Sequence, residues 1–332
     1  MTIIDIARIS GFSKSTVSRV LKDDPNVKAS TREKIRAVMR ENNFIRSELA
    51  ASMVAGSIRM VLIITGDIEN SYYAHSVKKI EEVLAREGFM TILCNSGYDA
   101  DKEARYLNLA AEFRFAGVIM MTAIESPQLY RILDRLQCPV VLLNRHLRQR
   151  SFDSIIQNNF VAAYGATEYL IKQGHRRILH LAGIKGASAS EDRLAGYLKA
   201  MEDMGCEVRQ DMIVYGDLTG ECGMALAERL IAEPSDITAV FIVNFAMAMG
   251  FAQRWWMSNK KIPDDISVIS YDRTSLMDFM PVSISSVGVD SGIMGEEAAN
   301  RILARINGDT GPTRLVVLDA KLDIRGSVKP LL

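Results

Sequence analysis

Short apolar segments alternate with helix-like stretches from residue 60 onward, and this alternation restricts the fold more than any other feature of the sequence. The apolar segments include residues 60–65, 90–96, 116–122, 139–144, 178–183, 239–244 and 267–272. Strands without polar alternation, separated by helices of roughly 12 to 17 residues, are typical of parallel sheets that are covered on both faces. Eleven such runs are too many for one ordinary sheet. We therefore expect two doubly wound α/β lobes with a crevice between them, and ligands bind beyond the carboxyl ends of strands in such lobes.

Ahead of these segments, residues 2–22 predict two short helices joined by a tight turn. Thr2 and Ser13 suit the two N-caps, and Gly11 suits the turn because that position requires a positive φ. The expected inward positions are Ile3, Ile4, Ile6, Ala7 and Ile9 in the first helix and Val17, Val20 and Leu21 in the second.

The outward face of the second helix is polar and cationic. It contains Lys14, Ser15, Thr16, Ser18 and Arg19, with Ser13 at its start. Small hydroxyl groups and long cations on a second short helix suit entry into the major groove of DNA. Periodicity alone leaves open the alternative of a capped helical hairpin with a solvated face.

A third helix is predicted from Ser30 to Asn42, and Ser30 with Glu33 has the spacing of a capping box. Its expected buried positions are Ile35, Val38 and Met39. Residues 1–44 thus form a three-helix head. Residues 45–57 are rich in Ala and Ser and are interpreted as a linker with latent helical propensity.

The head is also more basic than the rest of the chain. Residues 1–50 contain ten Lys or Arg and six Asp or Glu, a net charge of +4. Since the whole chain contains 40 of each sign, the other 282 residues carry −4. A basic head on a mildly acidic body fits a phosphate-binding module attached to a domain that does not contact DNA.

The segment IDIARISGFSKSTVSRVL resembles the N-terminal helix-turn-helix of the LacI–GalR family of bacterial transcription regulators. Three further matches follow in the order of the family: QGHRRI at 173–178, EDRLAGYLKAM at 191–201 and IPDDISVISYD at 262–272. The resemblance therefore covers the length of the chain.

The resemblance implies a core at 58–332 that is similar to periplasmic sugar-binding proteins. One lobe would hold residues of about 58–157 and 288–316, and the other about 158–287 and 317–332. The chain would cross between the lobes near 157–160, 286–290 and 316–321.

The resemblance also implies that residues 45–57 form a hinge helix that orders on DNA, with Met53 inserted into the minor groove. Leu is usual at the position of Met53, Pro at Arg46 and Arg at Ala51. These departures alter the details of the hinge contact. On the head, the matching positions imply base contacts for Lys14, Ser15 and Arg19, and phosphate contacts for Ser13, Thr16 and Ser18.

Polar and aromatic side chains follow the predicted strands and form the candidate ligand site. They are Asn70, Tyr72, Tyr73, Asn144, Arg193, Asn244 and Asp272. Aromatic rings can stack on a flat or sugar-like face, and Arg and Asp can make charge-assisted bonds to hydroxyl or carboxylate groups. The resemblance implies that all but Asn70 line an effector pocket. Each residue also has a structural interpretation: Asp272 as a helix cap, Tyr73 as a core residue, and Arg193 paired with Glu191 or Asp192 at the surface.

Two departures from the family occur beside this site. Phe245 stands where the family usually has Asp, and Val289 stands where it usually has Gln. If both side chains face the ligand, we expect a ligand with fewer hydroxyl groups on that side than a common hexose, or one with a flat face that stacks on Phe245. The alternative is that Phe245 packs at a helix start and Val289 lies in a crossover.

Other reactive residue types have structural interpretations. We interpret His175, which follows Gly174, as a structural residue near a helix end, and Trp255 and Trp256 as packing residues. The four cysteines are far apart and are expected to be reduced thiols, mostly buried; they are Cys94, Cys138, Cys206 and Cys222.

The sequence contains no GxSxG elbow, P-loop, HExxH motif or Rossmann glycine fingerprint. We therefore expect no enzyme, no cofactor and no metal site. No signal-peptide pattern precedes the helix-turn-helix, and no uninterrupted apolar stretch has spanning length, so a cytoplasmic location is expected.

These features favour a ligand-responsive transcription regulator, most simply a repressor. A homodimer on a near-palindromic operator is expected because one recognition helix contacts few base pairs. The chain ends at Leu332, soon after the last apolar run at 314–325, which suggests no C-terminal tetramerisation helix. The Asn144–Arg145 pair and the triplet 191–193 favour a sugar or sugar derivative over a purine. The alternative function is a solute-binding protein without a DNA-binding role.

Overall fold

The computed structural model describes residues 1–21, 23–44, 58–233, 235–274 and 283–331. The expected hinge helix at 45–57, including Arg46, Ala51 and Met53, therefore lies outside the described residues. The chain divides into two compact units, Met1–Ile58 and Arg59–Leu332, which we call the head and the core.

The head consists of three helices: α1 (Ile3–Ser10), α2 (Lys14–Leu21) and α3 (Ala29–Glu41). Thr2 caps α1 in a capping box with Asp5, whose carboxylate accepts a bond of 2.8 Å from the Thr2 backbone N–H. Gly11 has φ +72° and ends α1 in the left-handed conformation, as predicted. Ser13 Oγ accepts a bond from the Thr16 backbone N–H at 3.2 Å and caps α2, as predicted.

Two expectations for the head are wrong. Ile4 and Ile9 are 61% and 47% exposed, because the eight residues of α1 present only a narrow face to the other helices. The capping box at Ser30 does not form, because α3 begins one residue earlier. The Lys28 carbonyl accepts the first backbone bonds of that helix. The small core of the head centres on Ile6, Ala7, Val17, Val20 and Ile35.

The first lobe of the core is a six-stranded sheet in the order β11-β5-β4-β3-β1-β2. Its strands are β1 (Ile58–Thr65), β2 (Met90–Asn95), β3 (Phe115–Met120), β4 (Val140–Leu143), β5 (Asp153–Gln157) and β11 (Leu315–Leu318). Alternate residues of β1 enter different cores. Val61 and Ile63 pack toward α5 (Ser71–Arg86) and α12 (Ser291–Ile306), while Leu62 and Ile64 pack toward α6 (Ala100–Glu112) and α7 (Pro127–Leu133). Both faces of the sheet are therefore covered, as expected for a doubly wound lobe.

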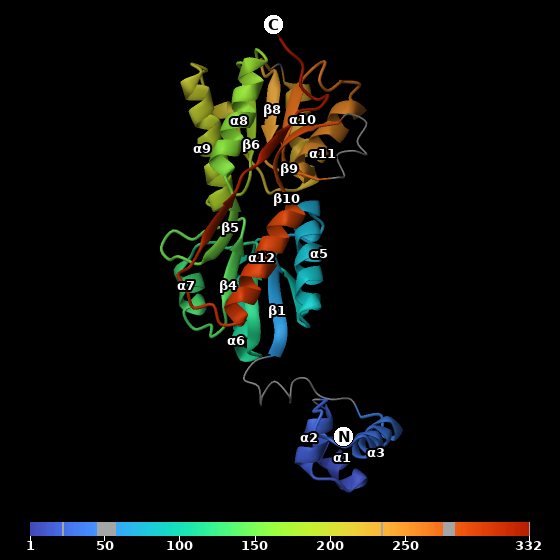
Figure 1. Cartoon of the computed structure of the whole chain (residues 1–332). Coiled ribbons are helices and arrows are strands. Elements are labelled where there is room, and N and C mark those ends of the chain that lie inside the picture. Colours follow the sequence, from blue (N-terminus) through green and yellow to red (C-terminus); the bar gives the residue numbers. More distant parts are fainter. Residues whose placement is uncertain (22, 45–57, 234, 275–282, 332) are drawn as a thin grey trace. The chain divides into compact units, whose positions relative to one another are not determined.

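The second lobe is a six-stranded sheet in the order β12-β10-β9-β8-β6-β7. Its strands are β6 (Ile178–Ala182), β7 (Ile213–Tyr215), β8 (Ala239–Ile242), β9 (Ser267–Arg273), β10 (Ser285–Asp290) and β12 (Lys321–Asp323). Its helices are α8 (Asn159–Lys172), α9 (Ser188–Asp203), η1 (Gln210–Met212), α10 (Gly220–Ala232) and α11 (Phe245–Met257). Figure 1 shows the pair α8–α9 and the pair α10–α11 on opposite sides of the sheet. Helices α10 and α11 approach closely because a Cβ at Gly223 would collide with the Met247 carbonyl.

All seven apolar runs named from the sequence form strands, but the run at 314–325 does not form a single one. It contributes β11 to the first lobe and β12 to the second, where β12 pairs antiparallel with β10. The expectation of uniformly parallel sheets is therefore wrong at β12. This chain reversal lets one short segment complete an edge of each sheet.

The crossover segments are joined by hydrogen bonds. Gln157 Oε1 accepts a bond of 3.0 Å from the Val289 backbone N–H, and the Asn158 N–H donates to the Leu318 carbonyl at 3.1 Å. The connections that follow β5, β10 and β11 thus lie side by side at the passage between lobes.

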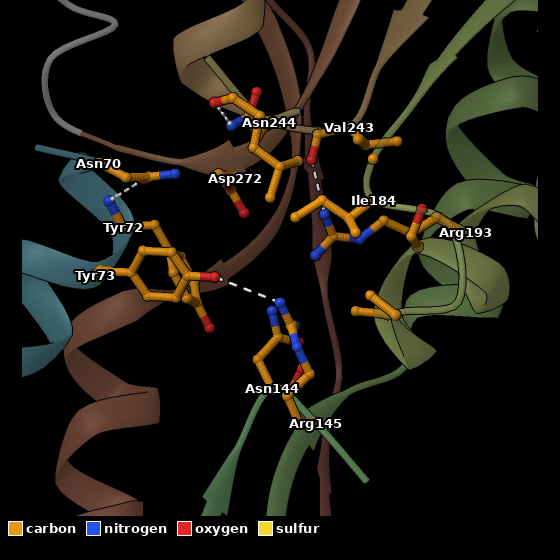
Figure 2. A pocket seen from close by; sticks show the side chains of 15 residues that line it. Asn70, Tyr72, Tyr73, Asn144, Arg145, Ile184, Arg193, Val243, Asn244 and Asp272 are labelled. Carbon is orange, nitrogen blue, oxygen red and sulfur yellow. Dashed lines mark hydrogen bonds between the residues drawn. The ribbon is translucent and has the colours of Figure 1, made fainter. Parts of the chain in front are cut away.

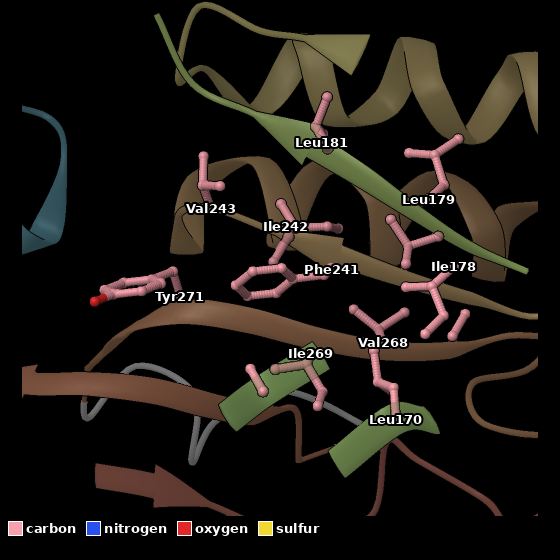
Figure 3. Packing of buried hydrophobic residues seen from close by; sticks show 14 of the residues in the cluster. Leu170, Ile178, Leu179, Leu181, Phe241, Ile242, Val243, Val268, Ile269 and Tyr271 are labelled. Carbon is pink, nitrogen blue, oxygen red and sulfur yellow. The ribbon is translucent and has the colours of Figure 1, made fainter. Parts of the chain in front are cut away.

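The second lobe contains one continuous apolar core, part of which is drawn in Figure 3. Phe241 and Tyr271 lie in this core, with ring centroids 6.5 Å apart. His180 is fully buried between the rings of Tyr197 and Phe241, at centroid distances of 4.9 and 5.0 Å. Burial lowers the pKa of His180 to about 3, because a charged imidazolium would lose its hydration there.

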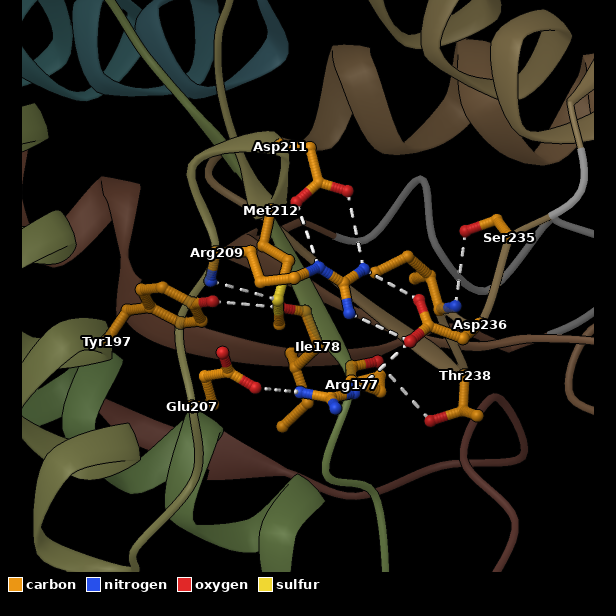
Figure 4. A network of polar contacts seen from close by, with 11 residues as sticks. Arg177, Ile178, Tyr197, Glu207, Arg209, Asp211, Met212, Ser235, Asp236 and Thr238 are labelled. Atoms are coloured by element: carbon orange, nitrogen blue, oxygen red, sulfur yellow. Dashed lines mark hydrogen bonds and ion pairs between the residues drawn. The ribbon is translucent and has the colours of Figure 1, made fainter.

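The QGHRRI segment is structural. His175 is fully buried and its ring contacts Thr238 Oγ1 at 2.9 Å and the Lys329 carbonyl at 3.1 Å, as the structural interpretation predicted. Arg177 pairs with Glu207 and Asp236 in the polar network of Figure 4. In the same network Arg209 makes two bonds to Asp236, at 2.8 and 2.7 Å, and two to Asp211. These contacts join the loops at one end of the second sheet.

Strand β2 occupies an edge of the first sheet and is not covered as a core strand would be. Met90, Ile92 and Leu93 are 58%, 37% and 43% exposed. An apolar sheet edge of this kind is available for pairing with another protein surface.

Among the cysteines only Cys206 is buried and the other three are half-buried, so the expectation of mostly buried thiols is wrong. Trp255 is buried and Trp256 packs against the same core. In the described part of the chain, no group of three His, Cys, Asp or Glu side chains could hold a metal ion. None of the described helices is both long and apolar enough to cross a membrane.

Candidate ligand pocket and DNA-reading helix

One pocket in the core collects all seven of the predicted ligand-site residues (Figure 2). Its empty volume is about 440 Å³, which includes solvent at its mouth. The lining consists of Asn70, Tyr72, Tyr73, Asn144, Arg145, Gly183, Ile184, Ala187, Ala189, Ser190, Arg193, Leu218, Val243, Asn244 and Asp272. These residues come from both lobes, and most of them follow the carboxyl ends of strands.

The start of α5 provides the aromatic side of the pocket. Asn70 caps this helix by accepting a bond of 3.0 Å from the Tyr72 N–H. The rings of Tyr72 and Tyr73 meet edge to face at 5.6 Å, and both residues are buried. Tyr73 therefore serves the core and the pocket together. The Tyr72 hydroxyl has no hydrogen-bond partner among the described residues.

The segment after β4 provides an amide and a cation. Asn144 has φ +54°, and its side-chain Oδ1 is buried without a partner in the described part of the chain. Arg145 is 7% exposed. Its Nη1 donates to the Asn144 carbonyl at 2.6 Å, and its Nη2 donates to the Tyr73 hydroxyl at 3.4 Å. The Tyr73 hydroxyl also accepts a bond of 3.4 Å from Tyr98.

Arg193 on α9 provides the second cation. Its Nε donates to Asn159 Oδ1 at 2.9 Å, and its Nη1 donates to the Val243 carbonyl at 2.7 Å. The guanidinium lies 3.6 Å from the centroid of the Tyr271 ring, a cation–π distance. With 6% exposure and these partners, Arg193 is not paired with Glu191 or Asp192 at the surface. That alternative is wrong.

The ends of β8 and β9 complete the second-lobe side. Asn244 caps α11 by accepting from the Met247 N–H at 2.9 Å, and its Nδ2 donates to the Leu218 carbonyl at 2.8 Å. Asp272 is 6% exposed. Burial raises the pKa of the Asp272 carboxyl, although Arg193 and the Phe245 backbone N–H act in the opposite direction.

Three pocket residues have left-handed backbone conformations: Asn144, Leu218 (φ +72°) and Asp272 (φ +70°). Positive φ is unfavourable for a leucine and is tolerated better by Asn and Asp. Such conformations concentrate at binding sites that the surrounding structure holds in place. The backbone conformations therefore indicate a binding site at the same position as the side chains do.

Phe245 and Val289 do not line the pocket. Phe245 is buried at the first position of α11, and Val289 packs in the core of the first lobe. The backbone explains both placements, because Asn244 turns the chain into the helix and the Val289 N–H is held by Gln157. This agrees with the packing alternative and removes the reason to expect a less hydroxylated ligand.

Arg145 and Ser190 line the pocket but were not predicted from the sequence as ligand-site residues. Arg145 directly follows Asn144 at a strand end, and that position was the available signal. Ser190 lies in the first turn of α9, ahead of Arg193, and its buried Oγ has no partner among the described residues.

The second helix of the head and Ser13 before it carry the residues that were assigned to base and phosphate contacts. Lys14, Ser15 and Arg19 are exposed, while Thr16 and Ser18 are half-buried. Ser13 Oγ lies 2.8 Å from the hydroxyls of both Ser15 and Thr16. These hydroxyls therefore satisfy one another in the absence of DNA, and the two cations extend into solvent.

Comparisons with known proteins identify both units. The profile of periplasmic binding proteins and the sugar-binding domain of the LacI family matches residues 59–324. The profile of bacterial regulatory proteins of the lacI family matches residues 2–47. The HTH-type transcriptional repressor PurR of Vibrio campbellii (strain ATCC BAA-1116) is 30% identical over 331 residues, which are 99% of each chain.

Solved structures share the fold. The transcriptional regulator CelR–cellobiose complex aligns with a TM-score of 0.74 and 25% identity, covering 98% of this chain and 99% of that one. The lac repressor dimer bound to operator and the anti-inducer ONPF aligns with a TM-score of 0.84 and 23% identity, covering 99% of each chain. A helical head followed by two parallel-sheet lobes is therefore a known architecture of transcriptional regulators.

Proposed function

Because this chain belongs to the LacI family of bacterial transcriptional regulators, which are not enzymes, we propose that it is a repressor whose operator affinity is controlled by a small molecule in the core pocket. The pocket itself carries the proposal. It combines aromatic rings, amides, a carboxylate and guanidinium groups from both lobes, so a bound ligand would contact both lobes at once. A ligand that favours one arrangement of two lobes shifts the population toward that arrangement.

We assign the ligand contacts to Asn70, Tyr72, Tyr73, Asn144, Arg193, Asn244 and Asp272, and add Arg145. A sugar or sugar derivative suits this set, because hydroxyl groups can donate to Asp272 and accept from Arg193 while the rings cover an apolar face. The solved CelR–cellobiose complex, which shares this fold, also supports a carbohydrate ligand.

We assign base contacts to Lys14, Ser15 and Arg19 and phosphate contacts to the hydroxyls of Ser13, Thr16 and Ser18. The exposed cations of α2 support this assignment. In domain terms, 1–44 is the DNA-binding head, 45–57 the hinge with Met53 as the wedge, and 58–332 the effector-binding core. The lobe limits expected at 287/288 and 316/317 fall inside β10 and β11, so we place them after Asp290 and Leu318. We propose the cytoplasm as the place of action.

We propose that the protein acts as a homodimer on a near-palindromic operator. One recognition helix reads few base pairs, and two symmetric half-sites double the contacts. The exposed apolar side chains of β2 are a candidate part of the dimer surface.

The first test is an electrophoretic mobility shift with the DNA upstream of the protein's own gene, repeated with sugars, sugar acids and nucleobases. Binding that a sugar or sugar acid changes supports the proposal. Ligand binding without any DNA binding favours the alternative of a solute-binding protein.

A variant of the head tests the base assignment. A bidentate Arg–guanine contact provides about 1–3 kcal/mol of discrimination, so Arg19→Ala should reduce the preference for operator over random DNA. The matched control is Arg40→Ala, because Arg40 is an exposed cation in the last turn of α3. Retention of the full operator preference by Arg19→Ala would contradict the assignment.

A further inference from the structure

The charge in the ligand pocket is not balanced. Among its lining residues Arg145 and Arg193 are cations, and Asp272 is the one carboxylate. All three residues are 6–7% exposed. Arginine stays protonated in proteins, so both positive charges persist in this buried setting.

Both guanidinium groups bond only to neutral atoms in the described part of the chain. Arg193 donates to the Asn159 side chain and the Val243 carbonyl, and Arg145 donates to the Asn144 carbonyl and the Tyr73 hydroxyl. An arginine has five N–H donors, and these bonds occupy only two on each side chain. In Figure 2 the Arg145 guanidinium points into the pocket toward Tyr73, and Arg193 enters from the other side.

Two carboxyl groups, those of Asp272 and Glu103, lie near enough to interact electrostatically with Arg145. Glu103 is 1% exposed on α6 and is not among the lining residues. Its Oε2 accepts a bond from the Ile124 N–H at 3.3 Å. Burial raises the pKa of both carboxyl groups, and the positive charge of Arg145 acts in the opposite direction.

Unpartnered polar atoms surround the same space. Asn144 Oδ1, Ser190 Oγ and the Tyr72 hydroxyl are buried and have no hydrogen-bond partner among the described residues. Buried polar groups are normally satisfied, so these atoms indicate a ligand with several hydrogen-bonding groups.

We propose that the effector is a sugar acid whose single carboxylate binds the guanidinium of Arg145. This inference rests on the proposed function and specifies the ligand of the same pocket. A carboxylate matches the planar fork of arginine and can accept two parallel bonds. One negative charge balances the excess of one, since two arginines face one lining carboxylate. The sugar hydroxyls would then reach Arg193, Asp272 and the unpartnered atoms.

Other ligand classes fit less well. A neutral hexose or a purine base leaves two lining arginines against one lining carboxylate, and an uncompensated buried charge is costly. A phosphate dianion can also accept two parallel bonds from an arginine, but it carries one charge more than the lining residues require.

The test is titration calorimetry of the full chain with ring sugars and their C6 acids, glucose with glucuronate and galactose with galacturonate, and with gluconate as an open-chain acid. The methyl ester of galacturonate restores a neutral ligand of the same shape, and glucose 6-phosphate represents the phosphate. Charge-assisted bonds of this type correspond to about 10- to 100-fold in affinity. We expect at least one acid to bind more tightly than its neutral partner by this factor, and its ester to lose the gain.

Variants assign the effect to one side chain. Arg145→Gln should weaken binding of the acid by about 10- to 100-fold and binding of its neutral partner by less than about threefold. The matched control is Arg148→Gln, which removes an exposed guanidinium from the same loop outside the pocket. An unchanged ratio of acid to neutral affinity in Arg145→Gln overturns the proposal.

The outcomes separate this proposal from the proposed function. Equal binding of a neutral sugar and its acid overturns the sugar-acid inference and leaves a sugar-controlled regulator intact. Preference for glucose 6-phosphate over every acid overturns the assignment of a carboxylate to Arg145. Binding of adenine or hypoxanthine alone overturns both the inference and the carbohydrate assignment.

A ligand-free measurement decides the charge argument independently. If Arg145 lacks a counter-charge, Arg145→Gln should raise the melting temperature of the free protein or leave it unchanged, because replacing an uncompensated buried charge removes a penalty. A fall of several degrees, with no fall in Arg148→Gln, would show that the protein already compensates Arg145 and would overturn the proposal.

Discussion

The two sides of the pocket contain the same residue type at the same burial but hold it differently. On the second-lobe side, Arg193 makes bonds of 2.9 and 2.7 Å to separate elements and stacks on Tyr271. On the first-lobe side, Arg145 bonds to the carbonyl of the preceding residue and makes only a long contact of 3.4 Å to Tyr73.

The amides differ in the same way. Both polar atoms of the Asn244 side chain are bonded, whereas Asn144 Oδ1 has no partner among the described residues. The second-lobe side therefore holds its arginine and its amide in place without ligand, and Ser190 Oγ is its one lining side-chain atom without a partner among the described residues. The first-lobe side leaves both Asn144 Oδ1 and the Tyr72 hydroxyl without one. Preorganised groups lose little entropy on binding, and unsatisfied groups gain bonds that they lack in the free protein. We infer that the first lobe gains more from ligand binding than the second.

The largest expected effect comes from removing the preorganised arginine. Arg193→Gln should destabilise the second lobe by about 2–4 kcal/mol, because Asn159 and the Val243 carbonyl lose a charged donor and the stacking on Tyr271 is lost. Urea unfolding followed by tryptophan fluorescence measures this, since both tryptophans lie on α11 of the second lobe.

Arg145→Gln is the control for this comparison and should change the same midpoint by less than about a quarter as much. Equal destabilisation by the two variants would contradict the contrast between the two sides. A stable Arg193→Gln protein would show that the bonds of Arg193 contribute nothing before ligand binds.

Much of this pocket could be predicted from the sequence because parallel strands bring their carboxyl ends to one edge. Asn144, Asn244 and Asp272 each follow an apolar run, so their convergence required only the assumption of doubly wound lobes. Arg145 could not be recognised as equally important. A cation after a strand usually lies at the surface, and its burial here depends on Tyr73 and Tyr98, which are distant in sequence.

The chain reversal at β12 and the directions of some side chains could not be predicted from the sequence either. The run at 314–325 is continuous in hydrophobicity, so nothing in it shows that β11 and β12 join different sheets. The direction of the Phe245 side chain depends on where α11 begins, because a one-residue change in the helix start rotates the side chain by about 100°. Ser30 was assigned a cap on spacing alone, whereas α3 begins at Ala29 with Lys28 as its N-cap and no side-chain cap bond.

An effect of intermediate size is expected on the pH dependence of stability, and it comes from His180 in the ring stack behind Arg193. His180 is buried without a hydrogen-bond partner among the described residues. Its folded pKa of about 3 lies below the unfolded value of about 6.5, so the unfolded chain binds the proton first. The stability that neutral His180 provides is therefore complete above pH 6.5 and is lost as the pH falls toward 3, by about 2 kcal/mol at pH 5.

His180→Phe keeps a ring in the stack and removes the titration, so its loss of stability between pH 7 and pH 5 should be smaller than that of the wild type by this amount. Urea midpoints at the two pH values, read from the tryptophans, test it. His175 remains in both proteins and contributes a loss of the same sign, because burial also lowers its pKa. Parallel pH profiles for wild type and variant would mean that His180 reaches water in the native state.

The smallest effect on stability is expected from Tyr73→Phe. This variant is informative because its main effect should be a loss of affinity for the effector. The Tyr73 hydroxyl makes two contacts, to Arg145 and Tyr98, and both are 3.4 Å long, so Tyr73→Phe should change the free energy of unfolding by less than about 0.5 kcal/mol. In the ligand complex the hydroxyl helps to orient the Arg145 guanidinium, so the variant should weaken binding of the effector by about three- to tenfold. Tyr98→Phe is the matched control, because it removes a hydroxyl that reaches the pocket only through Tyr73. If Tyr73→Phe instead destabilises the ligand-free core as strongly as Arg193→Gln, the first-lobe side is already tightly bonded before ligand arrives. The proposed contrast between a preorganised second-lobe side and a loosely bonded first-lobe side would then be wrong.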